Sequence, residues 1–231
     1  MKVKTGISGL DVITNGGFEE RSIVLVTGGP GTGKTLLALQ YIAAGAEAGE
    51  KCLYVSFEEK ENDLILDAAS IGIELDKLIK NGKVFIHYLE PFTATHITDH
   101  IHKVIKAEKI KRVVIDSTSV FGLYLLDVYK IRKRLYDLME SLKELGATSL
   151  MTAEVSRDTP LDSSEASSSY SRFGVEEYIA DTVLLLHYSG LGGGFDRTIQ
   201  VLKMRRTDHK RGLFPMRITS KGLVVNSKDS V

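Results

Sequence analysis

The strongest chemical pattern of the chain lies in VTGGPGTGKTLL, residues 26–37. Gly28 to Thr35 fits G-x-x-x-x-G-K-[ST] without a mismatch, between a hydrophobic run and a helical pattern. Closely spaced glycines let backbone N–H groups turn inward around phosphate oxygens, and a helix N-terminus adds its positive dipole. The stretch therefore predicts a loop that binds the phosphates of a nucleotide.

Two side chains of this loop have distinct expected roles. We expect Lys34 to reach the β and γ phosphates and the Thr35 hydroxyl to bind Mg²⁺. The residues expected to bind the nucleotide are Gly29, Pro30, Gly31, Thr32, Gly33, Lys34 and Thr35.

Carboxylates follow two other hydrophobic runs. KRVVID, residues 111–116, ends in Asp116, and KCLYVSF, residues 51–57, is followed by Glu58 and Glu59. Because ligands gather at the carboxyl ends of parallel strands, we expect Asp116 to orient Mg²⁺ or its bound water. Adjacent carboxylates raise one another's pKa, which suits a general base or an acceptor that orients water, and Glu58 is favoured slightly over Glu59. A solvated strand end before a helix is the alternative.

The elements that would position these residues alternate between short β-branched runs and helical patterns. This order predicts an α/β fold with a mostly parallel sheet flanked by helices. Strands are expected at 22–28, 51–57, 83–89, 111–116 and 147–154, and helices at 34–49, 61–72, 96–110 and 129–146.

The C-terminal part differs in character. Runs at 181–188, 197–204 and 212–219 are joined by tight turns, which predicts antiparallel strands added to the sheet. Between the two parts, the serine-rich segment 157–174 is typical of a mobile loop. We expect one domain over residues 1–231.

Composition excludes several classes of protein. The 30 basic and 30 acidic residues give a net charge of zero, so only a local patch could attract an anionic partner. The single cysteine, Cys52, excludes an intrachain disulfide, and no apolar run approaches the roughly 18 residues of a membrane span. We therefore expect a cytoplasmic protein with no membrane partner.

Together these motifs resemble the RecA/KaiC-type P-loop ATPase superfamily, and the chain is similar to single-domain KaiC-like proteins of archaeal type. The stretches that carry the resemblance are TGISGLDVITNGG, GGPGTGKT, SFEE, VVIDS, FGVEEYIADTVLLLHY and LKMRRTDHKRGLFPMRIT. The resemblance implies a RecA-like fold, Mg²⁺-dependent ATP binding and hydrolysis at subunit interfaces, and a homo-oligomer in the form of a hexameric ring.

The resemblance also assigns roles to individual residues. Glu58 and Glu59 match the paired catalytic glutamates of the family, and Asp116 matches its Walker B aspartate. His209, with Asp208, lies where the family places nucleotide contacts.

The chain departs from the family in three respects. Arg21 stands where the family has a glycine, so the turn there is expected to differ. KaiC proteins have two such domains in tandem, and this chain has one, so clock behaviour does not follow. The phosphorylated Ser-Thr pair of the clock protein would fall near Glu177 and Tyr178, which argues against the same autophosphorylation.

Residues 201–212, VLKMRRTDHKRG, concentrate five cations. By the resemblance, Lys203 and Arg205 match a K-x-R pair that reaches the ATP of a neighbouring subunit. In a regular strand Ile199, Val201, Lys203 and Arg205 would share one face, so both cations could clamp one phosphate. Such a contact is head-to-tail and must close into a ring or run on as a filament. A solvated cationic surface and a nucleic-acid contact are the alternatives.

Two functions from different classes follow. The favoured one is a regulatory or signalling ATPase that acts on an unidentified protein partner. The alternative is an accessory ATPase of DNA recombination or repair, similar to RecA/RadA paralogues. DNA would meet the loop at 157–174, where Tyr170 and Phe173 are the available stacking rings. This loop is net acidic, a poor match to the cationic grooves of single-strand binders.

The helix expected at 96–110 carries two candidate metal ligands. His96 and His100 are one helical turn apart and could share a zinc ion. The spacing also fits an ordinary amphipathic helix, which is the favoured interpretation.

Overall fold

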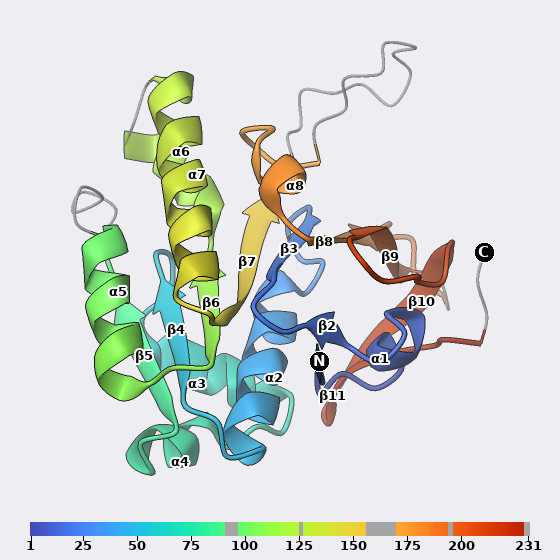
Figure 1. Cartoon of the computed structure of the whole chain (residues 1–231). Coiled ribbons are helices and arrows are strands. Elements are labelled where there is room, and N and C mark those ends of the chain that lie inside the picture. The colour runs from blue at the N-terminus through green and yellow to red at the C-terminus, as the bar shows by residue number, and fades with distance from the viewer. Residues whose placement is uncertain (91–96, 125–126, 156–169, 194–195, 229–231) are drawn as a thin grey trace.

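The computed structural model describes residues 1–90, 97–124, 127–155, 170–193 and 196–228. Its centre is one large sheet (Figure 1). The strands of this sheet are β3 (Ile23–Gly28), β4 (Cys52–Ser56), β5 (Val84–Tyr88), β6 (Arg112–Asp116), β7 (Thr148–Glu154), β8 (Thr182–Tyr188), β9 (Arg197–Met204), β10 (Leu213–Thr219) and β11 (Gly222–Val225). Their order across the sheet is β11-β10-β9-β8-β3-β7-β6-β4-β5.

Helices cover both faces of this sheet (Figure 1). One face packs against α2 (Lys34–Glu47), α3 (Glu61–Ser70) and α4 (Leu75–Lys80), and the other against α5 (Ile97–Glu108) and α7 (Val128–Glu144). The shorter elements are β1 (Lys2–Val3), α1 (Leu10–Ile13), β2 (Phe18–Glu19), the 3₁₀ helix η2 (Thr118–Val120), α6 (Phe121–Tyr124) and α8 (Glu176–Ile179). The expected α/β architecture is confirmed.

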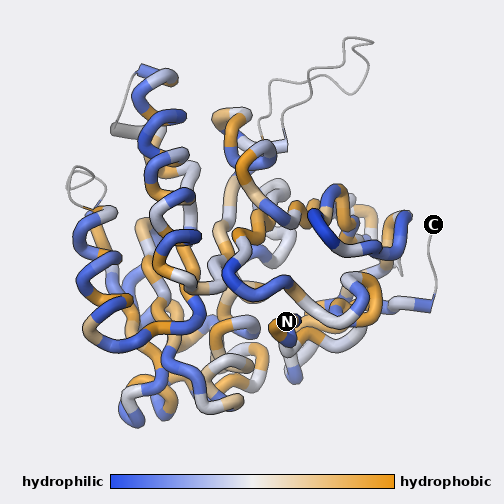
Figure 2. The backbone as a smooth tube through the Cα atoms, viewed as in Figure 1, coloured by the Kyte–Doolittle hydropathy of each residue, from blue (hydrophilic) through white to orange (hydrophobic). Residues whose placement is uncertain are grey.

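Strand β3 shows why the segments that form the central strands are hydrophobic at every position. Val24 and Val26 pack on the α2 side of the sheet, and Ile23 and Leu25 pack on the α7 side. Successive side chains of a strand point to opposite faces, so a strand covered on both faces must be apolar at every position. Figure 2 shows hydrophobic residues along the central strands and hydrophilic residues over much of α5 and α7.

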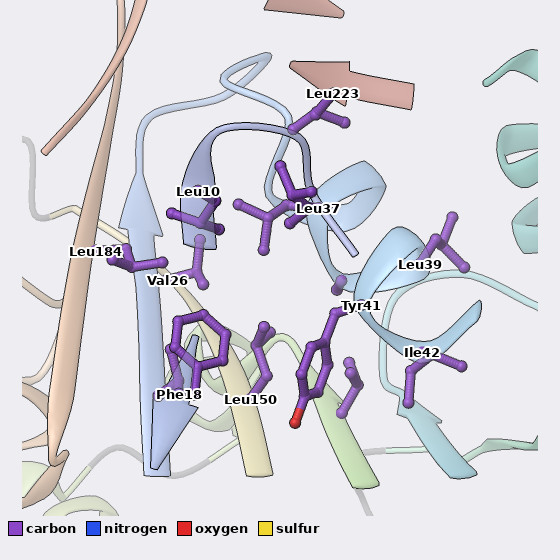
Figure 3. Packing of buried hydrophobic residues seen from close by; sticks show 14 of the residues in the cluster. Leu10, Phe18, Val26, Leu37, Leu39, Tyr41, Ile42, Leu150, Leu184 and Leu223 are labelled. Atoms are coloured by element: carbon purple, nitrogen blue, oxygen red, sulfur yellow. The ribbon is translucent and has the colours of Figure 1, made fainter. Parts of the chain in front are cut away.

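The core on the α2 side is built from large side chains with no exposed surface (Figure 3). Phe18 and Tyr41 contact each other with ring centroids 5.8 Å apart, and Leu37 and Leu150 belong to the same cluster. Cys52 also lies in this cluster, where burial raises the pKa of its thiol to about 12. The cysteine is therefore a buried part of the core.

The direction of β8 corrects one expectation. The sequence predicts an antiparallel strand at 181–188, but β8 pairs parallel with β3, and only its other neighbour, β9, is antiparallel to it. A parallel strand requires a long crossover connection, and the chain between β7 and β8 supplies one that includes α8. The antiparallel expectation holds for β9 and β10, and β11, which was not predicted from the sequence, adds a further antiparallel strand beside β10.

The N-terminal segment lies beside the C-terminal strands (Figure 1). The Val225 N–H donates to the Ser8 carbonyl at 2.8 Å, and the Lys210 N–H donates to the Ile13 carbonyl at 2.9 Å. Arg21 adopts φ 58°, the left-handed conformation that glycine favours. The turn before β3 therefore takes a glycine-like conformation although an arginine occupies it.

Candidate active site

The carboxyl ends of four parallel strands bring the expected site residues together. In register, Gly28 at the end of β3 lies opposite Glu154 of β7, and Asp116 at the end of β6 lies opposite Ser56 of β4. The glycine-rich loop follows β3, and Glu58 and Glu59 follow β4. Parallel pairing thus places the expected phosphate loop and all three expected acidic residues at one edge of the sheet, as predicted.

The loop from Gly29 to Gly33 leads directly into α2. Gly31 and Gly33 have φ values of +72° and +97°, and the Thr32 hydroxyl donates to the Gly29 carbonyl at 2.8 Å. Gly33 is the N-cap of α2, and no side chain caps this end. The first N–H groups of the helix therefore remain available to an anion, and the loop fits a phosphate group.

Lys34, the first residue of α2, turns back over the loop. Its ammonium donates to the carbonyls of Gly28 and Gly29, both at 3.0 Å. Burial lowers the pKa of Lys34, while the charges of Glu154, Asp116 and Glu58 oppose this effect. A phosphate arriving at the loop would replace the two neutral carbonyls with a charged partner, which strengthens the hydrogen bonds of the lysine.

Asp116 is buried and held in place by two hydroxyl groups. Tyr54 donates to its Oδ2 at 2.5 Å, and Thr152 donates to its Oδ1. Fixed carboxylate oxygens, together with the hydroxyl of Thr35 at the start of α2, are the hard ligands that Mg²⁺ prefers. The donor set is therefore compatible with Mg²⁺ or with a water molecule bound to it.

The two glutamates after β4 differ in their environment. Glu58 is exposed and accepts a hydrogen bond from the Ser117 hydroxyl at 2.5 Å. Glu59 is half-buried, and within the described part of the chain its Oε2 is buried without a hydrogen-bond partner. The pKa of Glu59 is raised to about 7, first by burial and then by the charges of Asp67, Asp116 and Glu58.

The expected rise in pKa is therefore confirmed for Glu59, but its cause is different. Repulsion from Glu58 is a minor contribution, because burial dominates and two other acidic residues act more strongly. A carboxyl group that titrates near neutral pH suits a proton acceptor.

Glu154, at the end of β7, is a further acidic residue at this edge of the sheet, and it was not predicted from the sequence. It lies opposite Gly28 in register, and its backbone N–H donates to the Ser119 hydroxyl oxygen at 2.7 Å. Among the charges that oppose the lowered pKa of Lys34, that of Glu154 has the largest effect. The signal was present, because ATSLMTAE ends in an acidic residue just as KRVVID does. Ser117 and Thr152 were also missed as direct partners of the acidic residues.

Lys203 and Arg205 converge on the short helix α8. The ammonium of Lys203 donates to the carbonyls of Glu177 and Tyr178 at 3.0 and 3.2 Å, and Arg205 donates to the Tyr178 carbonyl at 2.9 Å. Arg205 also lies 3.8 Å from the buried carboxylate of Asp181. The two cations are therefore neighbours, as expected.

The prediction that Lys203 shares a strand face with Ile199 and Val201 is wrong, however. The pairing of β8 with β9 shifts between Val183 and Leu184, so that Val183 lies opposite Lys203 and Leu184 opposite Val201. This bulge inserts Leu202, which packs in the core on the α7 side, whereas Val201 and Met204 pack on the α2 side. Lys203 therefore does not continue the face of Ile199 and Val201.

The cations lie at the end of the sheet opposite the phosphate loop. The Arg205 N–H donates to the Asp181 carbonyl, and the Asp181 N–H donates to the carbonyl of Ile23, the first residue of β3. The phosphate loop follows Gly28, the last residue of β3, five residues farther on. At about 3.3 Å per residue, the two ends of β3 are about 17 Å apart, which is farther than either side chain extends.

The remaining expected residues give a mixed result. His209 is half-buried, and among the described residues its Nδ1 has no hydrogen-bond partner. His100 contacts His87, with ring nitrogens 2.7 Å apart, while His96 lies outside the described residues. No group of three or more potential metal ligands occurs among the residues that the structure describes.

The expected DNA-contacting loop is described only from residue 170 onward, since 157–169 lie outside the described residues. Phe173 is not available for stacking, because it is buried and packs in the core on the α7 side. Tyr170 is exposed. One of the two expected stacking rings is therefore part of the core.

None of the helices that the structure describes is both long and apolar enough to cross a bilayer.

Comparison with known proteins gives consistent matches over nearly the whole chain. The family model of the KaiC ATPase matches residues 3–230. The circadian clock oscillator protein KaiC of Prochlorococcus marinus subsp. pastoris is 37% identical over 97% of this chain and 45% of its own length. That of Synechococcus elongatus is 36% identical over 96% of this chain and 43% of its own length. The chain thus spans less than half of these curated relatives.

A solved structure shows the same fold. The crystal structure of a KaiC-like protein from the hyperthermophilic archaeon Pyrococcus horikoshii superposes with a TM-score of 0.85. The two chains are 38% identical, and the match covers 97% of this chain and 98% of the other.

Proposed function

Because the chain belongs to the KaiC ATPase family, we propose that it binds ATP with Mg²⁺ and hydrolyses it at sites that lie between identical subunits. The observation that carries the proposal is the convergence of the uncapped start of α2, Lys34 and Asp116 at one edge of the sheet. The glycine-rich loop and Lys34 would hold the phosphates, and Thr35 and Asp116 would hold Mg²⁺ or its water. When bound, Mg²⁺ would neutralise negative charge on the β and γ phosphates.

The acidic residues after β4 would handle the attacking water. Glu59, with a pKa near 7, is partly deprotonated at neutral pH and could accept a proton, and Glu58 could orient the water together with Ser117. The assignment of one of them as the base stays a prediction, with Glu58 favoured slightly on the sequence alone.

The proposed subunit interface is supported by the position of Lys203 and Arg205. Lys203 and Arg205 lie too far from their own phosphate loop to contact its nucleotide, so we propose that they act on the ATP of a neighbouring copy. We also propose that His209, five residues after the end of β9, contacts the nucleotide of the neighbouring copy. The contact is head-to-tail, and a closed hexameric ring is the proposed assembly. A regulatory or signalling role in the cytoplasm, through a protein partner, completes the proposal.

The test separates binding from hydrolysis. We expect Lys34→Ala to weaken ATP binding at least tenfold in a fluorescence titration, because the lysine is the charged partner of the phosphates. Glu58→Gln and Glu59→Gln should both retain ATP binding. The variant that removes the general base should release phosphate about 10²- to 10⁴-fold more slowly than the wild type. Lys106→Ala, on the exposed face of α5, serves as the control. Wild-type protein that binds no ATP in the presence of Mg²⁺ would refute the proposal.

A further inference from the structure

The end of β8 and the start of β9 lie beside the phosphate loop. Gly28, at the end of β3, lies opposite Leu186 of β8, so the last residue of β8, Tyr188, emerges next to the loop. Across the turn, Arg197 begins β9 opposite Tyr188. The pairing of these two strands therefore places the aromatic ring of Tyr188 and the guanidinium group of Arg197 beside Gly31 of the loop.

Both side chains contact the loop at Gly31. The Arg197 guanidinium stacks on the Tyr188 ring at 4.0 Å from its centroid, and its Nε donates to the Gly31 carbonyl at 3.3 Å. The Tyr188 ring lies so close that a Cβ on Gly31 would meet it at 3.7 Å. The arginine is thus held by the ring in the orientation in which it contacts the loop.

The base of the turn is itself tied together. The Asp196 carboxylate accepts from the Ser189 hydroxyl at 2.8 Å and from the Gly192 N–H at 3.1 Å, and it lies 4.0 Å from Nη1 of Arg197. These hydrogen bonds, Ser189 first, lower the pKa of Asp196. The carboxylate therefore stays charged at neutral pH and fixes the backbone from which Arg197 extends.

We propose that Arg197, oriented by Tyr188, is a positioning residue for ATP binding that holds the apex of the phosphate loop in its binding conformation. The inference rests on the proposed function. The loop is rich in glycine, and glycine loses more conformational freedom on ordering than any other residue. By fixing the Gly31 carbonyl on the outer side, Arg197 leaves the neighbouring N–H groups facing inward, so less freedom is lost when phosphate binds.

The role is confined to the ground state. Arg197 is bonded to a loop carbonyl and not to an acidic residue of the site, so it helps bind the nucleotide without acting on the transferred phosphate. A residue of this kind changes the apparent affinity and leaves turnover at saturation unchanged.

The experiment measures ATP affinity, turnover and thermal stability on the full chain. We expect Arg197→Ala to raise the dissociation constant and the KM for Mg·ATP about tenfold, with kcat at saturation retained. Arg197→Lys should bind Mg·ATP nearly as weakly as Arg197→Ala, because lysine has neither a planar group that stacks on the Tyr188 ring nor an Nε donor. Tyr188→Ala should weaken ATP binding as well. The double variant Tyr188→Ala/Arg197→Ala should bind no more weakly than Arg197→Ala, because both substitutions disrupt the same contact of Arg197 with the loop.

Thermal unfolding distinguishes positioning from a structural role. The midpoint without nucleotide should match that of the wild type, while the rise produced by ATP should shrink in Arg197→Ala. Lys51→Ala is the matched control, because Lys51 also lies over an aromatic ring, that of Phe85 at 5.5 Å, but at the opposite end of its strand from the site.

Three outcomes would overturn the inference or its premise. Unchanged ATP affinity in Arg197→Ala, with binding lost in Lys34→Ala, refutes the role of Arg197 and leaves the ATPase proposal standing. A lower midpoint without nucleotide and unchanged affinity shows a structural role only. Wild-type protein that fails to bind ATP removes the premise itself.

Discussion

At Glu59, burial and the surrounding acidic residues set the protonation state together. The pKa of this carboxyl is raised to about 7, with burial as the largest cause. The charged form is therefore destabilised in the folded chain, and its Oε2 lacks a partner within the described structure. A residue held in this way costs folding stability once it ionises, which is a common property of functional sites.

This pKa predicts a pH-dependent effect on stability. Between the unfolded value of about 4.5 and the folded value of about 7, the folded chain binds more protons at Glu59 than the unfolded chain, so its contribution to the free energy of unfolding falls as pH rises. We expect Glu59→Gln to unfold at a higher temperature than wild type at pH 8, with the difference shrinking towards pH 5. Thermal melts without nucleotide measure it.

An exposed carboxyl group away from this cluster, Glu47 at the end of α2, provides the comparison. Glu47→Gln should show no such dependence on pH. A Glu59→Gln variant whose advantage is the same at pH 5 and pH 8 would contradict the raised pKa.

Among the elements, α8 connects the site of its own chain with the two cations. Its first residue, the buried Glu176, accepts from the Thr118 hydroxyl at 3.4 Å, two residues beyond Asp116. The carbonyls of Glu177 and Tyr178 hold Lys203 and Arg205. Burial raises the pKa of Glu176, as expected for a carboxyl group inside the protein. A helix of four residues therefore lies between the candidate active site and the two cations.

Asp181, two residues after α8, anchors this arrangement. Its carboxylate accepts from the Ile23 N–H at 3.0 Å and lies within 3.8 Å of Lys143, Arg205 and Arg206. We expect Asp181→Ala to lower the free energy of unfolding by about 2 kcal/mol, because it leaves a buried N–H without an acceptor. Asp181→Asn should cost less, since its amide oxygen can still accept that hydrogen bond.

Urea denaturation measures both variants. The control is Asp76→Ala, which breaks the exposed i,i+4 pair with Lys80 and should cost about 0.3–0.5 kcal/mol. Equal losses for the Asp181→Ala and Asp76→Ala variants would show that the buried hydrogen bond contributes little.

Prediction from the sequence succeeded where a pattern depends on neighbouring residues. The loop at Gly28 to Thr35 and the strand end at Asp116 are local signals, and parallel pairing brings them together without further information. The direction of β8 and the bulge at Leu202 could not be predicted, because both depend on how distant segments pack. The same is true of Arg197, whose partner Gly31 is 166 residues away.

At the scale of the whole molecule, the phosphate loop and the cations occupy opposite ends of β3. Under the proposed function, one chain would offer a nucleotide on one side and two cations on another, and the proposed sites would be complete only when chains associate head-to-tail. Cations supplied in this way are typically worth on the order of 10³ or more in rate.

Complementation between two inactive variants tests this arrangement. Arg205→Ala keeps its own phosphate loop, and Lys34→Ala keeps its own cations, so each should be inactive alone. In mixed assemblies the cations of the second variant would lie beside the ATP of the first, and we expect phosphate release well above the sum of the two separate rates. Assays at several mixing ratios measure the gain.

In the matched control, the double variant Lys34→Ala/Arg205→Ala replaces Lys34→Ala. This variant lacks Arg205, so mixing it with Arg205→Ala should not raise phosphate release. A mixture of the single variants that assembles but stays at the sum of its parts would show that each chain works by itself.

The buried thiol of Cys52 makes the chain well suited to site-specific labelling. With a pKa of about 12 and no exposed surface, this sole cysteine forms almost no thiolate at pH 8 and is shielded from alkylating reagents. A new cysteine at the exposed Leu191, on the turn beside the phosphate loop, would then carry a fluorophore alone. Energy transfer between labelled copies could follow the association of subunits as nucleotide is added.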